Sequence, residues 1–411
     1  MLKQISLLIL CAAAIVWFVT PVQACTSAVV SGKVTPDGRP LLWKNRDTDF
    51  MQNHIDYVKG EKYNFIAVVN SANAYLKEAW MGTNSAGFAL MNTQSYNLVD
   101  VKGDEERGAA NGRVIYRALE VCATVEDFCH FLDTISKPSD IEANFGVIDA
   151  QGGAAMFEVD YHKYVMYDAN NPKDAPYGYI VRTNFSFAGK VNEGAGYVRY
   201  MEADQVLMKS SATGSITPQF IFNDLSRSFR NRMLDIDLRS GAYNRPQASG
   251  WFVDQDFIPR SSTSCSVVVQ GEKAELTTMW TLLGYPPTGI AVPLWVKDAG
   301  KLLPGMVRFG KEHEAAPLSD WSLRLADRVF SYKQGMGTGR YLNWERLYSP
   351  EKGDGYMTAI TAVEDEVFRT TKPLLEEWYK KGSLDTQAIP KLYDELELSI
   401  RMIYQSLLES E

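Results

Sequence analysis

The strand-like segments of this sequence follow one another at hairpin-length spacing, and this spacing constrains the fold most strongly. Short runs rich in β-branched and aromatic residues, bounded by Gly, Asn, Asp and Pro, are typical of strands. Antiparallel neighbours need only short links, whereas parallel strands need crossovers of a dozen or more residues. The sequence therefore predicts antiparallel sheets rather than βαβ units. The predicted strands cover residues 27–32, 39–45, 64–69, 88–91, 144–148, 154–159, 163–167, 177–184, 264–270, 275–282 and 291–295.

Helical spacing of apolar residues marks the segments between these groups of strands. Residues 111–135 contain two such stretches, the second capped by Thr124, and further helices are predicted around 196–208 and 218–233. The chain order is thus strands, helices and strands again. We expect an α+β fold with two sheets and helices packed on their outer faces.

After about Pro304 the pattern becomes helical. Apolar residues repeat at helical spacing in residues 356–367 and 389–407. We expect Pro373 to break the first helix, because proline lacks the N–H that an interior turn needs, and Pro390 to start the last one. This extension is expected to pack on the main domain or on a second subunit. An independent binding module fits less well, because each helix has one apolar face to bury.

The N-terminus has the pattern of a secretory signal peptide. Lys3 is followed by an uncharged apolar run over residues 5–18, then by Pro21 and by small or modest residues at Val22 and Ala24. The run is shorter than the ~20 apolar residues that span a bilayer. We therefore predict an exported protein, periplasmic or secreted, that begins at Cys25. The predicted boundaries are 1–24 for the signal peptide, 25–304 for the main domain and 305–411 for the helical extension.

A cysteine at the start of a mature chain has its own free α-amino group as a neighbour. That amine has a pKa of ~7.7–8.0 and a thiol one of ~8.5, so the amine can act as the base for the thiol. Such amine-activated nucleophiles perform covalent catalysis without a histidine. Other interpretations stay open. Val22-Gln23-Ala24-Cys25 also resembles a lipoprotein cleavage box, the cysteine can follow the cleavage site by accident, and a papain-like Cys/His pair is a further alternative.

Charge and cysteine content exclude several classes of protein. A net charge of −8 argues against a nucleic-acid partner, which would need a basic face. With 45% hydrophobic and 22% charged residues, the chain has the composition of a globular protein with a sizeable core. No CxxC pair or His/Cys cluster has the spacing of a zinc site, so we expect no metal. Cys122 and Cys129 are either bridged or two separate buried thiols.

The Pro36-Asp37-Gly38 turn predicts which residues lie beside Cys25. A two-residue turn centred on positions 37 and 38 pairs residue i with about 75 − i, which places Cys25 opposite roughly position 50. A bulge could shift this register by a residue or two. The segment from Lys44 to Asp47 is therefore expected to return beside Cys25.

Several segments together resemble a known family. Their order is that of the N-terminal-nucleophile (Ntn) cysteine hydrolases acting on linear amides, which include choloylglycine (bile-salt) hydrolases, penicillin V acylases and isopenicillin-N acyltransferase-like enzymes. The resemblance runs from Cys25 to about Val296. It implies a four-layer αββα Ntn-hydrolase sandwich, a small-molecule N-acyl amide substrate and no cofactor. The segments are Cys25-Thr26, Pro36-Asp37-Gly38, Lys44-Asn45-Arg46-Asp47, the turn at residues 82–87 with Asn92, and Thr183-Asn184.

The resemblance also implies site residues. Asp47 would orient the N-terminal amine and thiol, and Asn92 would donate to the oxyanion. Asn184 would contact the amine and the reacting centre, and Arg199 would brace the site. Each has a plainer interpretation: a solvated turn acid, a strand-end turn residue, a glycosylation sequon (Asn184-Phe185-Ser186) and a helix-surface arginine.

The chain departs from the family at two points. Where the bile-salt branch has an arginine before Asn-x-Asp, this chain has Lys44, with Arg46 inside the motif, and either residue can take that arginine's place. Lysine keeps the charge but lacks the two-pronged geometry of a guanidinium. Acyltransferase-like relatives can free their cysteine by cutting themselves, whereas here a signal peptidase would suffice. The sequence does not say which acyl group and which amine the substrate carries, or whether the enzyme hydrolyses the amide or transfers the acyl group. It also leaves the oligomeric state open, and a homo-oligomer is one possibility.

Overall fold

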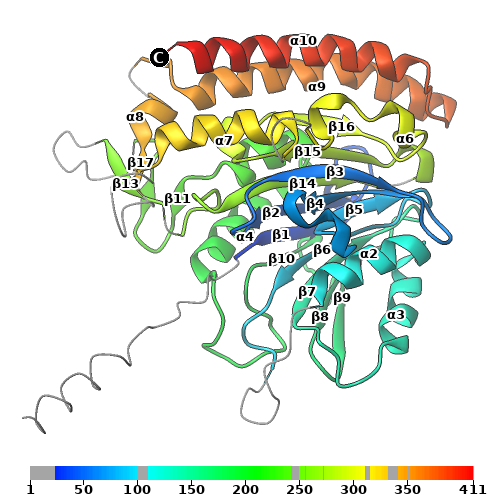
Figure 1. The fold of residues 1–411 in the computed structure, drawn as a ribbon. Coiled ribbons are helices and arrows are strands. Elements are labelled where there is room, and N and C mark those ends of the chain that lie inside the picture. The colour runs from blue at the N-terminus through cyan, green and yellow to red at the C-terminus, as the bar shows by residue number, and fades with distance from the viewer. Residues whose placement is uncertain are drawn as a thin grey trace, which may run out of the picture.

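The computed structural model describes residues 24–99, 110–241, 250–254, 256–271, 273–310, 315–331, 341–349 and 352–410 (Figure 1). The predicted signal peptide, apart from Ala24, lies outside the described residues.

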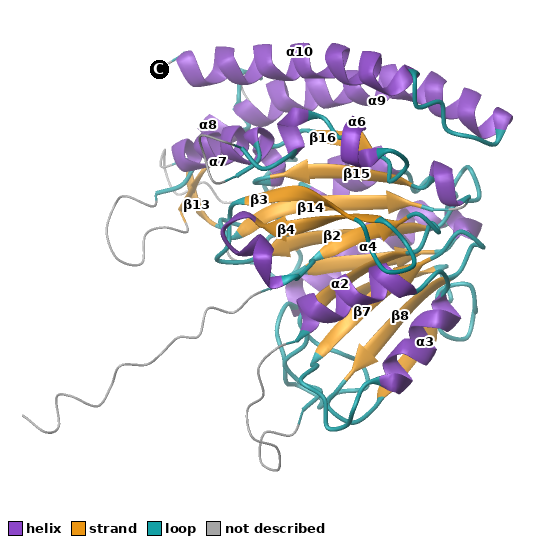
Figure 2. Cartoon of the chain, turned by 45° about the vertical axis from the view of Figure 1, so that its right-hand side comes forward, coloured by secondary structure: helices purple, strands orange, loops and turns teal. Residues whose placement is uncertain are grey.

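Two antiparallel sheets form the centre of the molecule (Figure 2). The six-stranded sheet has the order β10-β1-β2-β14-β15-β16, and the seven-stranded sheet runs in sequence order from β3 to β9. The first comprises β1 (Thr26–Val30), β2 (Leu41–Asp47), β10 (Tyr179–Arg182), β14 (Thr263–Gln270), β15 (Thr278–Leu283) and β16 (Ala291–Leu294). The second comprises β3 (Asn53–Val58), β4 (Phe65–Asn70), β5 (Met81–Asn84), β6 (Ala89–Gln94), β7 (Ala143–Ile148), β8 (Ala154–Val159) and β9 (Tyr164–Asp168).

Alternating side chains place the two sheets face to face. In β4, Ile66 and Val68 join the core that includes the six-stranded sheet, whereas Phe65 and Ala67 point to the opposite face. This period of two is what a strand buried on both faces requires. The outer face is covered by α2 (Asn111–Val121) and α3 (Val125–Thr134).

The ring of Phe128 anchors α3 on the sheet, with ring centroids 5.8 Å from Phe145 and 5.1 Å from Phe157. Thr124 and Asp127 form a capping box at the start of α3, so the predicted cap is confirmed.

The outer face of the six-stranded sheet is covered by helices as well. These are α4 (Tyr197–Ser211) and α5 (Pro218–Phe220), which continues as a π-helical turn over Ile221–Ser226. The prediction of a helix over 218–233 is too long. The chain leaves the helix where Arg227 turns its buried guanidinium toward the carbonyls of Pro286 and Gly289. The four layers are α, β, β and α, and the predicted αββα fold is confirmed.

The predicted register of the first hairpin is wrong by four residues. Thr26 pairs with Asn45 and Val30 with Leu41, so Cys25 lies nearest to position 46 rather than 50. The reason is the connection, which is not a two-residue turn: it contains a 3₁₀ turn at Gly32–Val34 before the turn at 35–38. The expectation that the segment from Lys44 to Asp47 returns beside Cys25 still holds.

The C-terminal helices pack on the main domain. The hydroxyl of Tyr393 donates to Pro293 O at 2.9 Å, and that of Tyr404 donates to Thr288 O at 2.8 Å. Helices and sheet share one apolar core, so they form one body (Figure 1). The main helices are α7 (Pro317–Val329), α9 (Tyr356–Lys381) and α10 (Ala388–Glu409). Shorter elements are α6 (Ala299–Leu302), α8 (Trp344–Leu347), β11 (Arg230–Asn231), β12 (Ile236–Asp237), β13 (Trp251–Val253) and β17 (Tyr341–Asn343).

The prediction that Pro373 ends a helix is wrong, because α9 continues through it to Lys381. Pro373 lies on the exposed side of α9, so the carbonyl that loses its partner there can be hydrated. None of the helices that the structure describes has the length and apolar character needed to cross a membrane.

Candidate active site

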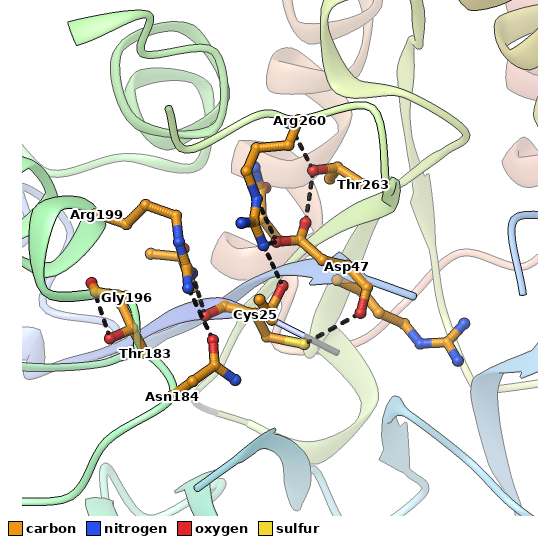
Figure 3. Close-up of polar contacts among 12 residues, drawn as sticks. Cys25, Asp47, Thr183, Asn184, Gly196, Arg199, Arg260 and Thr263 are labelled. Carbon is orange, nitrogen blue, oxygen red and sulfur yellow. Dashed lines mark hydrogen bonds and ion pairs between the residues drawn. The ribbon is translucent and has the colours of Figure 1, made fainter. Parts of the chain in front are cut away.

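Cys25 lies at the head of β1, the strand between β2 and β10, with only 6% of its surface exposed. This position brings the end of β2 to one side of the cysteine and the residues after β10 to the other (Figure 3). The thiol lies 3.9 Å from the backbone oxygen of Asp47. A weak thiol contact of this kind holds the sulfur at the junction of the three strands without removing its nucleophilicity.

Arg199 connects both sides of this junction. Its Nη1 donates to Cys25 O at 2.6 Å and to Thr26 Oγ1 at 2.8 Å, while its Nη2 donates to Asn184 Oδ1 at 2.8 Å (Figure 3). Burial lowers the pKa of Arg199 to about 10. The side chain is 1% exposed, so the alternative of a helix-surface arginine is wrong.

The N-terminus of α4 is shaped to fit this arginine. Gly196 has a φ of +87°, and a Cβ there would lie 2.4 Å from Arg199 Nη2. The hydroxyl of Thr183 donates to Gly196 O at 3.1 Å, which fixes the start of the helix against the end of β10. Only glycine combines this backbone conformation with so close an approach of the guanidinium.

Asp47 is a buried carboxylate with several donors rather than a solvated turn acid. Its Oδ2 accepts hydrogen bonds from Arg260 Nε at 3.1 Å and Nη2 at 2.5 Å, and its Oδ1 accepts one from Thr263 Oγ1 at 2.5 Å. Arg260 Nη2 also lies 3.3 Å from Ala24 O, the carbonyl just before Cys25. The carboxylate is therefore held beside the peptide bond whose cleavage would create the N-terminal cysteine.

Asn184 is fully buried and bonded at both ends of its amide. Its Oδ1 accepts from Arg199, and its Nδ2 donates to Gln94 O at 2.8 Å. Glycosylation needs an exposed amide nitrogen, so the sequon interpretation does not fit this position.

Lys44 and Arg46 lie on the same strand but serve different partners. Lys44 Nζ donates to Asn92 Oδ1 at 2.9 Å and to Trp80 O at 3.0 Å. The guanidinium of Arg46 instead reaches Asn53 and Asn70, at 2.5 and 2.8 Å. Burial lowers the pKa of Lys44 to about 8, against an opposing effect of Cys25. Of the two cations, Lys44 is the one in contact with the predicted oxyanion donor.

Arg260 and Thr263 escaped prediction. Arg260 lies just before β14 and Thr263 is its first residue. Neither belongs to a recognisable motif, and both meet Asp47 only because β14 pairs with β2. The local sequence of a strand does not determine which distant strand it pairs with. No local signal could therefore have identified Arg260 and Thr263.

The contacts of the cysteines do not support a papain-like Cys/His pair or a disulfide between Cys122 and Cys129. The side-chain and carbonyl contacts of Cys25 go to Asp47 and Arg199, neither of which is a papain-type histidine. The four described cysteines are free, so Cys122 and Cys129 are two separate thiols. Within the described ranges, no group of three His, Cys, Asp or Glu side chains could hold a metal ion.

One family model matches part of the chain. Residues 34–212, less than half of the chain, match the family model of acyl-coenzyme A:6-aminopenicillanic acid acyl-transferase. The resemblance to the linear-amide Ntn hydrolases is confirmed. The partial match agrees with an amide-cleaving or acyl-transferring activity. Lys44, Asp47, Asn92, Asn184 and Arg199 lie inside the matched range, whereas Cys25 and Arg260 lie outside it.

Solved structures of this group are similar at low sequence identity. Penicillin V acylase from Agrobacterium tumefaciens is 14% identical, with 66% of this chain and 86% of that chain covered and a TM-score of 0.37. A variant of conjugated bile acid hydrolase from Clostridium perfringens is 13% identical, with 67% and 93% covered and a TM-score of 0.39. The Caenorhabditis elegans ortholog of N-acylethanolamine-hydrolyzing acid amidase is 16% identical, with 49% and 89% covered and a TM-score of 0.34. No curated protein matches the chain.

Proposed function

We propose that this protein is an exported cysteine amidohydrolase or acyltransferase that cleaves a linear N-acyl amide through an acyl-enzyme on Cys25. One observation carries the proposal: Cys25, placed between β2 and β10, has Asp47 on one side and Asn184 on the other, with Arg199 joining Asn184 to the cysteine carbonyl. This is the set of groups that an N-terminal nucleophile needs within reach.

The reaction begins when the α-amino group of Cys25 takes the thiol proton and the thiolate attacks the amide carbonyl. A C–S bond forms, and the carbonyl electron pair moves to oxygen as an oxyanion. Collapse of this intermediate breaks the C–N bond, and the leaving amine takes the proton from the ammonium. Water, or another amine, then attacks the acyl carbonyl and gives a proton to the α-amino group. The C–S bond breaks, and the thiolate takes this proton back, which regenerates the free thiol.

The surrounding residues have distinct roles in this scheme. Asn92 is proposed to donate to the oxyanion, a contribution typically worth about 10²–10³ in rate. Asp47, fixed by Arg260 and Thr263, is proposed to hold the N-terminal amine. Asn184 and Arg199 keep Cys25 oriented through its carbonyl.

Export supplies the free amine in this proposal. The pattern of residues 1–24 is that of a signal peptide, and cleavage after Ala24 would expose the amine and thiol on one residue. The alternative of a lipid-anchored binding protein would require an acyl-glyceryl group on a sulfur that lies in a buried position. Burial of this sulfur among polar and charged side chains favours chemistry over anchoring.

The test uses the secreted enzyme and its Cys25→Ala variant with penicillin V, conjugated bile acids and N-acyl amino acids as candidate substrates. We expect the enzyme to release amine from one of these classes and the variant, folded as judged by circular dichroism, to release none. Full turnover by the variant would refute the mechanism. A matched Cys265→Ala variant, which removes a second buried thiol, is expected to stay active.

A further inference from the structure

Lys44 and Asn92 make a contact between the two sheets of the sandwich, from β2 to β6. We infer that Lys44 is a positioning residue that holds the amide of Asn92 with its Nδ2 turned toward the reacting carbonyl. The inference rests on the proposed function and goes beyond it, because it assigns a task to the lysine that replaces the family's arginine.

The direction of the Asn92 amide follows from what an ammonium can do. Lysine has three donors and no acceptor, so only the Oδ1 side of an amide can face it. Lys44 Nζ lies 2.9 Å from that oxygen. Asn92 Nδ2 donates to none of the residues that the structure describes, although the side chain is only 4% exposed. A fixed amide with a free donor at the site is what oxyanion stabilisation requires.

Lys44 is itself firmly placed. A second hydrogen bond, to Trp80 O at 3.0 Å, fixes Nζ from the other side, and the residue is 2% exposed. Both acceptors are neutral, and none of the described carboxylates forms an ion pair with Lys44. A buried ammonium without a counter-ion costs stability, and an apolar side chain would be favoured here by packing alone.

The charges around Lys44 come from three neighbouring strands. Cys25 belongs to the start of β1, Arg46 and Asp47 to β2 itself, and Cys265 to β14. Among the described residues, Lys44 Nζ hydrogen-bonds to Trp80 O and Asn92 Oδ1 and to none of these charged groups.

Arg46 offers a matched control. It lies two residues from Lys44 on the same face of β2 and is equally buried, but its guanidinium contacts Asn53 and Asn70 instead of Asn92. Replacing either cation with methionine removes a buried charge of the same strand. Only the Lys44 variant also releases the Asn92 amide.

The experiment compares the kcat and KM of Lys44→Met, Asn92→Leu, the double variant and Arg46→Met. We expect Lys44→Met and Asn92→Leu each to lower kcat by about 10²-fold with little change in KM. Because both act through one donor, the double variant should fall no further than Asn92→Leu, within about threefold. Arg46→Met should keep kcat within about threefold. Wild-type kcat in Lys44→Met, or losses that multiply in the double variant, would overturn the inference.

Asn92→Asp keeps the test informative if the methionine variants fold poorly. Its carboxylate would pair with Lys44 through a charge-assisted hydrogen bond, so the fold should be at least as stable, while the Nδ2 donor is gone. We expect kcat to fall by about 10²-fold or more in this variant, and unchanged kcat would overturn the inference. Cys25→Ala separates the two proposals: if it is inactive and Lys44→Met is fully active, only the role of Lys44 fails, whereas an active Cys25→Ala refutes the proposed function itself.

Discussion

Arg260 donates two hydrogen bonds to one carboxylate oxygen of Asp47, across 213 positions of sequence. Thr263 donates to the other oxygen, so both oxygens of the carboxylate are occupied. The arginine also reaches the carbonyl that precedes Cys25. The loop before β14 is thereby tied to the peptide bond between Ala24 and Cys25, where the proposed maturation would occur.

Asp47→Asn should weaken both the fold and the reaction. It leaves the largely buried guanidinium of Arg260 without a charged partner, a change that typically costs about 3–5 kcal/mol in the free energy of unfolding. Loss of the group that holds the amine should lower kcat by at least about 10²-fold. Urea unfolding and steady-state kinetics measure the two effects. The double variant Asp47→Asn with Arg260→Met should recover part of the stability and none of the activity. Recovery of activity would contradict the role given to Asp47.

Gly196→Ala should displace Arg199. The added Cβ would lie 2.4 Å from Arg199 Nη2, at a backbone φ of +87°. We expect a loss of about 1–2 kcal/mol in the free energy of unfolding together with a clear fall in kcat. Gly214→Ala is the control, because its φ is also positive, at +59°, but nothing lies within 4 Å of the new Cβ. It should lose stability alone, and an equal loss of activity in both variants would argue against the bracing role of Arg199.

The low pKa of Lys44 makes stability depend on pH in a defined direction. Burial lowers this pKa to about 8 in the folded state, from 10.5 for an unperturbed lysine. The unfolded chain therefore binds more protons between about pH 8 and 10.5, and the stability contributed at this position rises with pH across that window. Relative to Lys44→Met, the wild type should gain roughly 3 kcal/mol as the pH increases from 7 to 10.5. Urea unfolding of both proteins at several pH values checks this, and a difference that does not change with pH would contradict it.

A buried ion pair fastens the C-terminal helices to the main domain. Arg227 Nη1 and Nη2 contact the two carboxylate oxygens of Glu364 at 2.6 and 2.8 Å, and both residues are 1% exposed. Glu364→Gln should cost about 3–5 kcal/mol in the free energy of unfolding, because a buried cation loses its partner. Glu366→Gln, two residues along on the exposed side of α9, should change little. Equal stability of the two variants would show that the helices do not depend on this contact.

The sequence was informative wherever the signal is local. Alternation in β4 and the cap at Thr124 each depend on neighbouring residues, and the structure has both. The register of the first hairpin was wrong because a 3₁₀ turn at Gly32–Val34 lengthens a connection that looks like a two-residue turn. The prediction for Pro373 was wrong because a helix can continue through a proline whose side is exposed to solvent, and the sequence alone does not show which side of α9 is exposed.

The site residues follow the same rule: those in recognisable local segments could be predicted, and those placed by long-range pairing could not. Asp47, Asn92, Asn184 and Arg199 lie in segments whose order could be recognised. In the structure Asp47 and Arg199 contact Cys25, Asn184 is joined to it through Arg199, and Asn92 contacts Lys44. Arg260 could not be found, because its position depends on the pairing of β14 with β2 across most of the chain. The choice between Lys44 and Arg46 likewise depended on which partner faces each side chain across the sandwich.

The central claim is that maturation exposes an amine and a thiol on Cys25 and that this residue carries the acyl group. Intact mass spectrometry of the protein purified after export, before and after brief mixing with a substrate, tests it most directly. The account predicts the mass of residues 25–411 with an unmodified cysteine, followed by a transient increase equal to one acyl group, which peptide mapping places on Cys25. A terminus at any other residue, a lipid on the sulfur, or an acyl adduct that persists in Cys25→Ala would contradict it.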